Sequence, residues 1–238
     1  MHPEAPEGER RPRANSNCHY EFRWWYEYSG GKITDWGAHH VDIANWALKV
    51  NGQTDGPISI GGSAEHPVEY KDGFAVSNDR YNTATKFDFS VKYADETEIV
   101  IKHGGRNGVL IEGEKGRIFV SRRTLDGAPV KALKDNPLPE DAIQKVYKGL
   151  PMEHNERKAH WANFLHCHRE QVEPISDVHS HMQMLNICHL AGISARFGRD
   201  LKWDDKAEQI VGDDQANAFL KRPYREGYEI KMPEMAKS

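Results

Sequence analysis

The chain has 238 residues, of which 38% are hydrophobic and 29% are charged, and its formal net charge is −4. This length and composition are those of one globular domain with a sizeable core. The slight acidic excess, with no basic patch among aromatic residues, argues against nucleic-acid binding. No apolar run reaches the about 18 residues that a membrane-spanning helix needs, so we expect no membrane association.

Residues 1–17 are rich in proline, glycine and charge, which predicts an extended or disordered arm before a domain at residues 18–238. The sequence begins without the apolar segment of a signal peptide, but a preceding domain could carry one, so cytoplasm and periplasm both stay open. Cys18, Cys167 and Cys188 form neither a disulfide framework nor a paired metal motif. We expect reduced thiols.

Aromatic residues gather at positions 24–28, beside basic residues. In an extended strand, Trp24, Tyr26 and Tyr28 would share one face. Ring faces beside hydrogen-bond donors suit a polyhydroxylated ligand, because its C–H groups pack on the rings while its hydroxyls bind the donors. Burial in the core or in an oligomer interface is the alternative, which we expect for at least half of the rings. The candidates for substrate contact in this segment are Arg23, Trp24, Tyr26 and Lys32.

A helix is predicted after Gly30 and Gly31, which allow a sharp turn. Asp35 is the expected N-cap, with Thr34 as second choice, because either side chain can accept hydrogen bonds from first-turn amides. An advance of about 100° per residue then places four side chains within roughly 60° of one another. They are Asp35, His39, Asp42 and Trp46.

The opposite side of this helix carries small and apolar residues, so it can pack on a core while the polar stripe faces a cleft. These residues are Gly37, Val41, Ala44 and Leu48. A histidine with a pKa near 6.5 can exchange a proton with a substrate hydroxyl near neutral pH, and Asp35, one turn from His39, could orient it. The alternative is that Asp35 only caps the helix and that His39 pairs with it on the surface.

The middle of the chain alternates apolar and polar residues, which predicts strands. Residues 87–93 and 99–101 form one hairpin with one buried face, and residues 109–111 and 117–120 form a second that extends the same antiparallel sheet. Residues 124–150 carry three prolines and are expected to be a loop.

Helical periodicity returns at residues 156–169 and 177–197, with Gly198 as a stop, and a short last helix starts at Asp213 or Asp214. The stripes that indicate the two long helices are Trp161, Leu165 and His168 in the first and Met184, Ile187, Cys188, Ala191 and Ala195 in the second. Segregated helices and antiparallel hairpins predict an α+β fold. The uncovered sheet face would be apolar, so we expect a homo-oligomer that buries it.

Seven histidines lie between residues 154 and 189, but their spacing does not favour a metal site. The pairs His166/His168 and His179/His181 are two residues apart and point in nearly opposite directions on a helix. The sequence has no His-Glu-x-x-His motif or Cys/His pairing. We therefore expect no bound metal.

Several motifs together resemble the C-terminal domain of the Gfo/Idh/MocA oxidoreductases, most of all a bacterial branch abundant in planctomycetes. In chain order they are Phe22-Arg23-Trp24-Trp25-Tyr26-Glu27-Tyr28-Ser29-Gly30-Gly31, Thr34-Asp35-Trp36-Gly37-x-His39-His40-x-Asp42-Ile43, Gly113-Glu114-Lys115-Gly116-Arg117-Ile118, Pro174-Ile175-Ser176-Asp177-Val178, Arg196-Phe197-Gly198-Arg199-x-Leu201-x-Trp203-Asp204 and Gly212-Asp213-Asp214-Gln215-Ala216-Asn217. Each is weak alone, but their order and spacing run through most of the chain.

The resemblance implies a large, predominantly antiparallel sheet with helices on one face, like that of dihydrodipicolinate reductase. It also implies NAD or NADP as cofactor, oligomers formed through the sheet face, and the Asp-x-x-x-His pair, here Asp35 and His39, as the acid/base element. His181 would lie near the start of a helix that borders the substrate region.

The family pairs this domain with a nucleotide-binding domain, whose glycine-rich turn binds pyrophosphate and whose Glu-Lys-Pro motif supplies a catalytic lysine. Neither motif occurs here, and Gly104-Gly105-Arg106-Asn107-Gly108 lacks the required spacing. We therefore expect a substrate half without its cofactor half, whether truncated, expressed as a fragment or split from its partner.

Together these patterns predict the substrate-binding half of an NAD(P)-dependent oxidoreductase acting on a sugar, polyol or related cyclic alcohol. The alternative is a non-catalytic carbohydrate-binding or scaffold module. The expected catalytic residues are Asp35 and His39, and the expected substrate-binding residues are Arg23, Trp24, Tyr26, Lys32, Trp36, His40, Asp42, Trp46 and His181.

Overall fold

The computed structural model describes residues 21–50, 52–53, 55–142, 145 and 156–230. The predicted arm at residues 1–17 and the Cys18 thiol lie outside the described residues. Cys167 and Cys188 are free and buried. In the part of the chain that is described, no helix is both long and apolar enough to cross a bilayer.

The core is built on a five-stranded antiparallel sheet with the strand order β10-β9-β1-β4-β5. Its strands are β1 (Ser59–Glu65), β4 (Lys86–Lys92), β5 (Glu98–Lys102), β9 (Leu201–Asp204) and β10 (Gln209–Ile210). Strands β4 and β5 form the first predicted hairpin, in which Phe89 pairs with Ile101 and Val91 pairs with Ile99. All four side chains are buried on one face, because successive residues of a strand point to opposite sides. The sequence prediction of this hairpin and of an α+β fold is confirmed.

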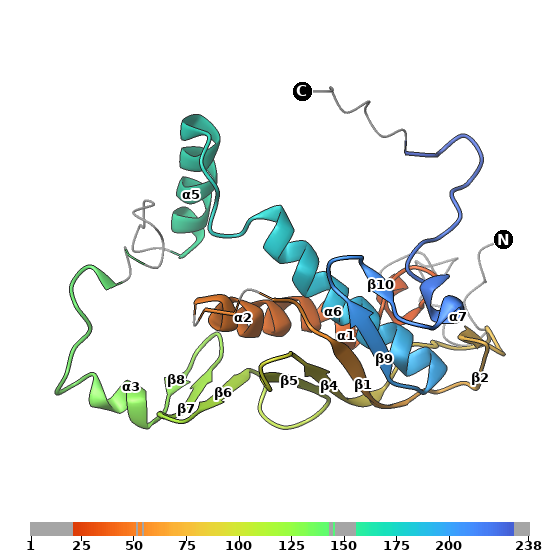
Figure 1. Cartoon of the computed structure of the whole chain (residues 1–238), viewed down its shortest axis with the longest axis horizontal. Helices are drawn as coiled ribbons and strands as arrows, with labels where there is room; N and C mark the ends of the chain where they lie inside the picture. The colour runs from red at the N-terminus through yellow and green to blue at the C-terminus, as the bar shows by residue number, and fades with distance from the viewer. Residues whose placement is uncertain (1–20, 51, 54, 143–144, 146–155, 231–238) are drawn as a thin grey trace.

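Helices α1 (Lys32–Asp35), α2 (Gly37–Val50) and α6 (Val178–Phe197) pack together, and α2 and α6 cover the apolar face of the sheet (Figure 1). Helix α6 begins where the Asp177 carboxylate accepts a hydrogen bond from the Ser180 amide, at 2.8 Å. It ends at Gly198 in the left-handed conformation, as predicted. Its predicted stripe is buried, and consists of Met184, Ile187, Cys188, Ala191 and Ala195.

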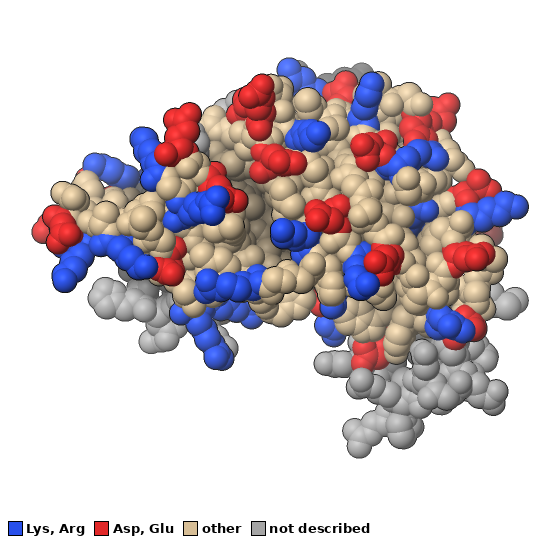
Figure 2. Space-filling view, turned by 90° about the horizontal axis from the view of Figure 1, so that it is seen from below, with Lys and Arg blue, Asp and Glu red and all other residues tan. Residues whose placement is uncertain are grey.

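The outer face of the main sheet is polar, which contradicts the expectation of an apolar face. It presents alternate residues of β4 and β5, among them Asp88, Lys92, Glu98 and Lys102. Figure 2 shows basic and acidic side chains interspersed over this side of the molecule. Apart from Val100, the apolar residues of β4 and β5 lie on the helix-covered face, so the outer face of these strands offers little apolar surface to bury. A homo-oligomer stays a prediction.

The second predicted hairpin forms, but it does not extend the main sheet. Strands β6 (Val109–Gly113), β7 (Gly116–Val120) and β8 (Leu125–Asp126) make a separate antiparallel sheet. Between β5 and β6 the chain turns through Gly104 and Gly105, which have φ values of 98° and 79°, and leaves the sheet edge. Such left-handed conformations are readily adopted by glycine.

Part of the predicted loop at residues 124–150 is ordered as β8 and as helix α3 (Ala128–Ala132). The proline in this helix lies in its first turn, where the missing amide hydrogen breaks no helical bond. The sequence prediction was wrong here because it took proline only as a helix breaker.

Helix α5 (Glu156–Glu170) has the predicted position but stands away from the body of the molecule (Figure 1). Its stripe of Trp161, Leu165 and His168 is exposed. The buried side instead carries Asn163, whose side-chain oxygen accepts from the Ile175 amide at 3.2 Å. Helix α5 is thus attached to the segment that follows it.

The remaining elements are short. They are the 3₁₀ helix η1 (Phe22–Trp24), strands β2 (Tyr70–Lys71) and β3 (Phe74–Ala75), and helix α7 (Asp214–Asn217). Asp213 caps α7 by accepting from the Ala216 amide at 2.9 Å, in agreement with the predicted start of this helix.

Tyr26 lies in the core and not on an accessible ligand-binding face. Only 6% of it is exposed, and its hydroxyl is 3.3 Å from Nε2 of His66. The guanidinium of Arg196 lies 5.1 Å from the centre of its ring. Burial raises the pKa of Tyr26 to about 12 and lowers that of His66 to about 4. The structure thus fits the core alternative for this tyrosine.

We expect Phe89→Ala to lower the free energy of unfolding by about 3–5 kcal/mol, because it leaves a cavity at a fully buried position of the central sheet. Val100→Ala is the control, since Val100 is 52% exposed on the outer face, and it should cost about 1 kcal/mol or less. Urea denaturation of both variants measures the difference. Similar losses for the two variants would show that the sheet is not packed in this way.

The buried His66 should make the protein less stable as the pH falls from about 6.5 to about 4. In this range the unfolded chain binds a proton at this imidazole while the folded chain does not, so protonation favours unfolding. His66→Gln should remove this part of the pH dependence, whereas His168→Gln, at an exposed position, should not. Urea denaturation of each protein at several pH values measures it. An unchanged pH dependence in His66→Gln would contradict the burial of a neutral imidazole.

Candidate functional site

The aromatic segment before the site is not a strand. Helix η1 is followed by turns in which the Ser29 amide donates to the Trp25 carbonyl at 2.9 Å. In a 3₁₀ helix and turns, side chains do not alternate between two faces as they do in a strand. The predicted common face of Trp24, Tyr26 and Tyr28 is therefore wrong.

Gly31 opens the helical segment that carries the site. Its φ of 63° is left-handed, and a Cβ there would come within 2.6 Å of Thr83. The Gly31 carbonyl accepts from the amides of Thr34 at 3.2 Å and Asp35 at 2.9 Å. The first turn of helix α1 thus begins at Lys32, and Asp35 ends it. The predicted N-cap role of Asp35 is wrong, because the Gly31 turn starts the helix earlier.

Trp36 joins α1 to α2 as a single turn residue. It has helical φ and ψ of −77° and −28°, and its carbonyl accepts from the amides of His39 at 3.1 Å and His40 at 3.0 Å. Asp35 and His39 therefore lie on two helices, one on each side of the junction. They form no ion pair with each other within the described structure, and the Asp35 carboxylate instead lies 3.5 Å from Nη1 of Arg23.

The predicted packing face of this segment is confirmed: Gly37 and Val41 are buried, and Ala44 and Leu48 pack against the core. A Cβ on Gly37 would lie 3.2 Å from Sγ of Cys188 on α6. The glycine thus lets the two helices approach closely at the beginning of α2.

Asp42 lies within electrostatic reach of two of the candidate histidines. Burial raises its pKa, while His181 on α6 and His39 on α2 act against this shift. The crossing of α2 and α6 therefore brings residues separated by more than a hundred positions around one carboxyl group. A carboxyl with a raised pKa, beside imidazoles, can take part in proton exchange closer to neutral pH than an ordinary aspartate.

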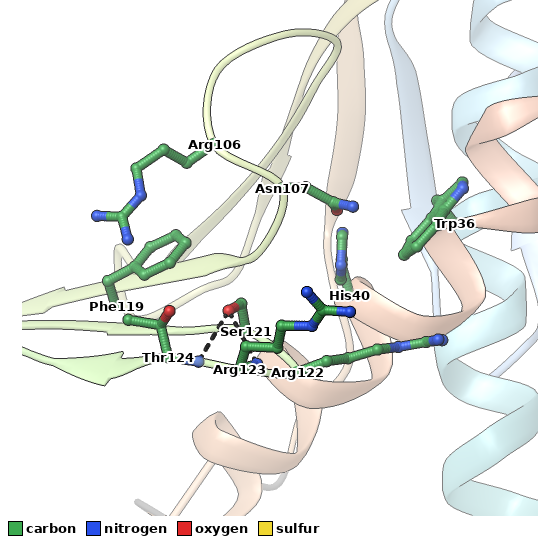
Figure 3. A pocket seen from close by; sticks show the side chains of 9 residues that line it. All are labelled: Trp36, His40, Arg106, Asn107, Phe119, Ser121, Arg122, Arg123 and Thr124. Atoms are coloured by element: carbon green, nitrogen blue, oxygen red, sulfur yellow. Dashed lines mark hydrogen bonds between the residues drawn. The ribbon is translucent and has the colours of Figure 1, made fainter.

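A cavity of about 520 Å³ lies between the start of α2 and one end of the β6–β7–β8 sheet (Figure 3). Figure 3 shows Trp36 and His40 on one side, with Arg106 and Phe119 at the far end. The lining consists of Trp36, His40, Arg106, Asn107, Phe119, Ser121, Arg122, Arg123 and Thr124.

Trp36 connects this cavity with the predicted catalytic histidine. Its ring centre is 6.0 Å from that of His39 and 5.5 Å from that of His40. The Arg122 guanidinium lies 5.3 Å from the same tryptophan ring. Burial, together with the positive charges of His39 and Arg122, lowers the pKa of His40. A neutral His40 at pH 7 offers one hydrogen-bond donor and one acceptor to the cavity.

Sequence reasoning missed the arginines of this cavity. Arg106 entered only as part of a glycine-rich segment that is not a nucleotide-binding motif, and Arg122 and Arg123 fall between the predicted strand at 117–120 and the predicted loop at 124–150. The signal was present, since pairing Val109 with Val120 places the residues before β6 and after β7 at the same end of the hairpin. The hairpin prediction therefore already implied that these arginines lie at the same end of the hairpin.

Of the nine predicted substrate residues, only Trp36 and His40 line the cavity; the other seven are Arg23, Trp24, Tyr26, Lys32, Asp42, Trp46 and His181. Nζ of Lys32 lies 3.1 Å from Nε2 of His103, and Nε1 of Trp24 donates to Glu21 at 2.7 Å. Trp46 is 41% exposed farther along α2. Their role in binding stays a prediction.

The described residues contain no group of three or more histidine, cysteine, aspartate or glutamate side chains that could hold a metal ion. The site is thus made of imidazoles, carboxylates, arginines and aromatic rings.

Among solved structures, the chain resembles the aldose-aldose oxidoreductase from Caulobacter crescentus complexed with glycerol, with 14% identity and a TM-score of 0.52. The match covers 77% of this chain and 51% of that one. It also resembles an NAD-binding protein from Listeria innocua, with 15% identity, a TM-score of 0.47 and coverage of 76% and 54%. No curated protein matches. The chain spans about half the length of these solved structures, and likeness at such identities concerns the fold alone.

The model of a protein family described as "Oxidoreductase family, C-terminal alpha/beta domain" matches residues 5–230, nearly the whole sequence. The match agrees with the antiparallel sheet and its covering helices. The chain therefore belongs to the Gfo/Idh/MocA oxidoreductase family and corresponds to its C-terminal domain.

Proposed function

We propose that this chain is the substrate-binding half of an NAD(P)-dependent oxidoreductase that acts on a sugar, polyol or related cyclic alcohol. The observation that carries the proposal is the pair of Asp35 and His39, four residues apart on the two sides of the α1–α2 junction and beside the Trp36 cavity, in a chain of this family. The pair has the residue types that proton exchange with a hydroxyl needs.

In this proposal His39 accepts the proton of the substrate hydroxyl during oxidation and returns it during reduction. It is exposed, so a bound substrate can reach its imidazole. Asp35 orients and polarises His39 once substrate has displaced the loose contact with Arg23, which is 3.5 Å long. Asp42, on α2 and near His181 of α6, is a second carboxyl that interacts electrostatically with His39.

A hydroxylated substrate suits the polar and aromatic lining of the cavity. Trp36 offers a 40% exposed ring for C–H groups, and Asn107, Ser121 and Thr124 offer amide and hydroxyl groups. The Caulobacter crescentus structure was obtained with glycerol, which is itself a polyol. That ligand supports, by analogy of fold, a polyhydroxylated substrate here.

The cofactor would be held by a nucleotide-binding domain outside this sequence, and there it would take up the hydride. The residues of this chain do not fit a dinucleotide site. Gly104 and Gly105 join strand β5 to strand β6, whereas a pyrophosphate-binding turn joins a strand to a helix N-terminus.

We expect His39→Ala to lower the turnover number of the enzyme, rejoined to a nucleotide-binding domain, by about 10²–10⁴-fold, since it removes the proton carrier. Asp35→Asn should lower turnover by a smaller factor, because the proton carrier is still present. His179→Ala, at an exposed position of α6, is the matched control and should leave turnover unchanged. Steady-state kinetics with a sugar or polyol substrate measures all three.

Equal and small effects of His39→Ala and His179→Ala would contradict the proposed role of His39. Sugar binding with no measurable turnover in the unsubstituted, rejoined protein would instead favour the non-catalytic carbohydrate-binding or scaffold module.

The 238-residue chain by itself should bind neither NAD nor NADP at micromolar concentration, because it has no phosphate-binding glycine turn. Isothermal titration calorimetry with each dinucleotide tests this expectation. Micromolar binding of either would mean that the cofactor site lies at least partly in this chain.

A further inference from the structure

We propose that the cavity beside His40 binds an anionic group, a carboxylate or phosphate, carried by the sugar or polyol substrate. The sugar part of this statement rests on the proposed function above. The anion-binding part rests on the geometry of the cavity alone and can be tested separately.

The cavity collects the positive charge of three arginines. Arg106, Arg122 and Arg123 line it, and no acidic side chain does. Within the described part of the chain, none of the three forms an ion pair with a carboxylate. The pKa of Asp126 on β8 is lowered mainly by Lys131, which pairs with its carboxylate at 3.2 Å, and least by the charge of Arg106. Guanidinium groups around a concave site favour an anion, which each of them can bind through paired hydrogen bonds.

Aromatic rings hold two of these guanidinium groups in place. Arg106 lies 3.8 Å from the centre of the Phe119 ring, and Arg122 lies 5.3 Å from that of Trp36. Figure 3 shows these two pairs at opposite ends of the cavity, with Arg123 between them. Cation–π contacts of this kind restrict the long side chains before a ligand binds, so less conformational entropy is lost on binding.

The turn that carries Arg122 and Arg123 is held by its own hydrogen bonds. Oγ of Ser121 accepts from the amides of Arg123 at 3.3 Å and Thr124 at 3.1 Å, and the Ser121 amide donates to the Thr124 carbonyl at 2.8 Å. These bonds define the backbone of the turn that carries the two consecutive arginines.

The size of the cavity suits a whole monosaccharide with its charged group. About 520 Å³ lies within the range of about 300–1,000 Å³ for small-molecule sites. His40, Asn107 and Thr124 supply neutral donors and acceptors for hydroxyl groups, while the arginines bind the charge. A neutral sugar would leave the arginines without a partner.

The experiment is isothermal titration calorimetry of the whole chain with glucuronate, glucose 6-phosphate, glucose and inorganic phosphate. We expect at least one acidic sugar to bind about tenfold or more tightly than glucose, and added sodium chloride to weaken that binding. Tighter binding of glucuronate would identify a carboxylate as the charged group, and tighter binding of glucose 6-phosphate would identify a phosphate.

Arg122→Gln and Arg123→Gln should each weaken binding of the acidic sugar about tenfold or more, because each loses a charged hydrogen-bond donor. Arg122→Lys should recover only part of this loss, since lysine keeps the charge without the planar guanidinium. The matched control is Arg117→Gln on β7, where the arginine is exposed and paired with Glu112 at 2.6 Å. Circular dichroism checks that each variant is folded.

Equal affinity for glucose and both acidic sugars, or losses no larger in the cavity variants than in Arg117→Gln, would overturn the anion proposal and leave the proposed function standing. Arginine-dependent binding of inorganic phosphate, with no gain from either sugar, would support the anion site and contradict the sugar substrate. The two failures are therefore distinguishable.

Discussion

The packing of α6 against the main sheet is the constraint from which the rest of the site follows. Leu190, Ala191 and Ser194 are almost completely buried, so this half of the helix is enclosed on most sides. A helix held in this way cannot shift without exposing apolar surface, which costs about 25 cal/mol per Å². Since α2 crosses α6 closely at Gly37, the position of α2 is fixed by the same core.

The residues proposed for catalysis and those proposed for anion binding thus lie on two different parts of the fold. His39 and His40 belong to a helix packed on the main core, whereas Arg106 and Arg123 belong to loops of the smaller sheet. The cavity between them has one wall on each. A small displacement of the smaller sheet would change the distance between the arginines and the imidazoles without disturbing the core.

Elements whose signal is local were predicted well from the sequence. The alternation around Phe89, the buried stripe around Ile187 and the stop at Gly198 each depend on neighbouring residues only. The errors arose where tertiary contacts decided the outcome. The left-handed Gly31, fitted against Thr83, started the helix before the expected cap, and the turn at Gly104 sent the second hairpin away from the main sheet.

The site was predictable in the same partial way. The spacing predicted Asp35 and His39 on one helix, whereas the structure has Asp35 at the end of α1 and His39 in α2. The partner of Asp35 could not be predicted, because Arg23 reaches it through a turn that no periodicity indicates. The closeness of Asp42 to His181 also depends on how α2 crosses α6. That Arg106 and Arg122 lie at the same end of the β6–β7 hairpin did follow from a pairing that the sequence already predicted.

The charged outer face of the main sheet has a consequence for how its strands align. Lys92 lies opposite Glu98 and Asp88 lies opposite Lys102, so each pair joins unlike charges. A shift of one residue between the two strands would turn charged side chains toward the helices, and a shift of two would separate both pairs. The surface charges thus disfavour misaligned pairing during folding, even where each exposed pair adds little to the stability of the finished protein.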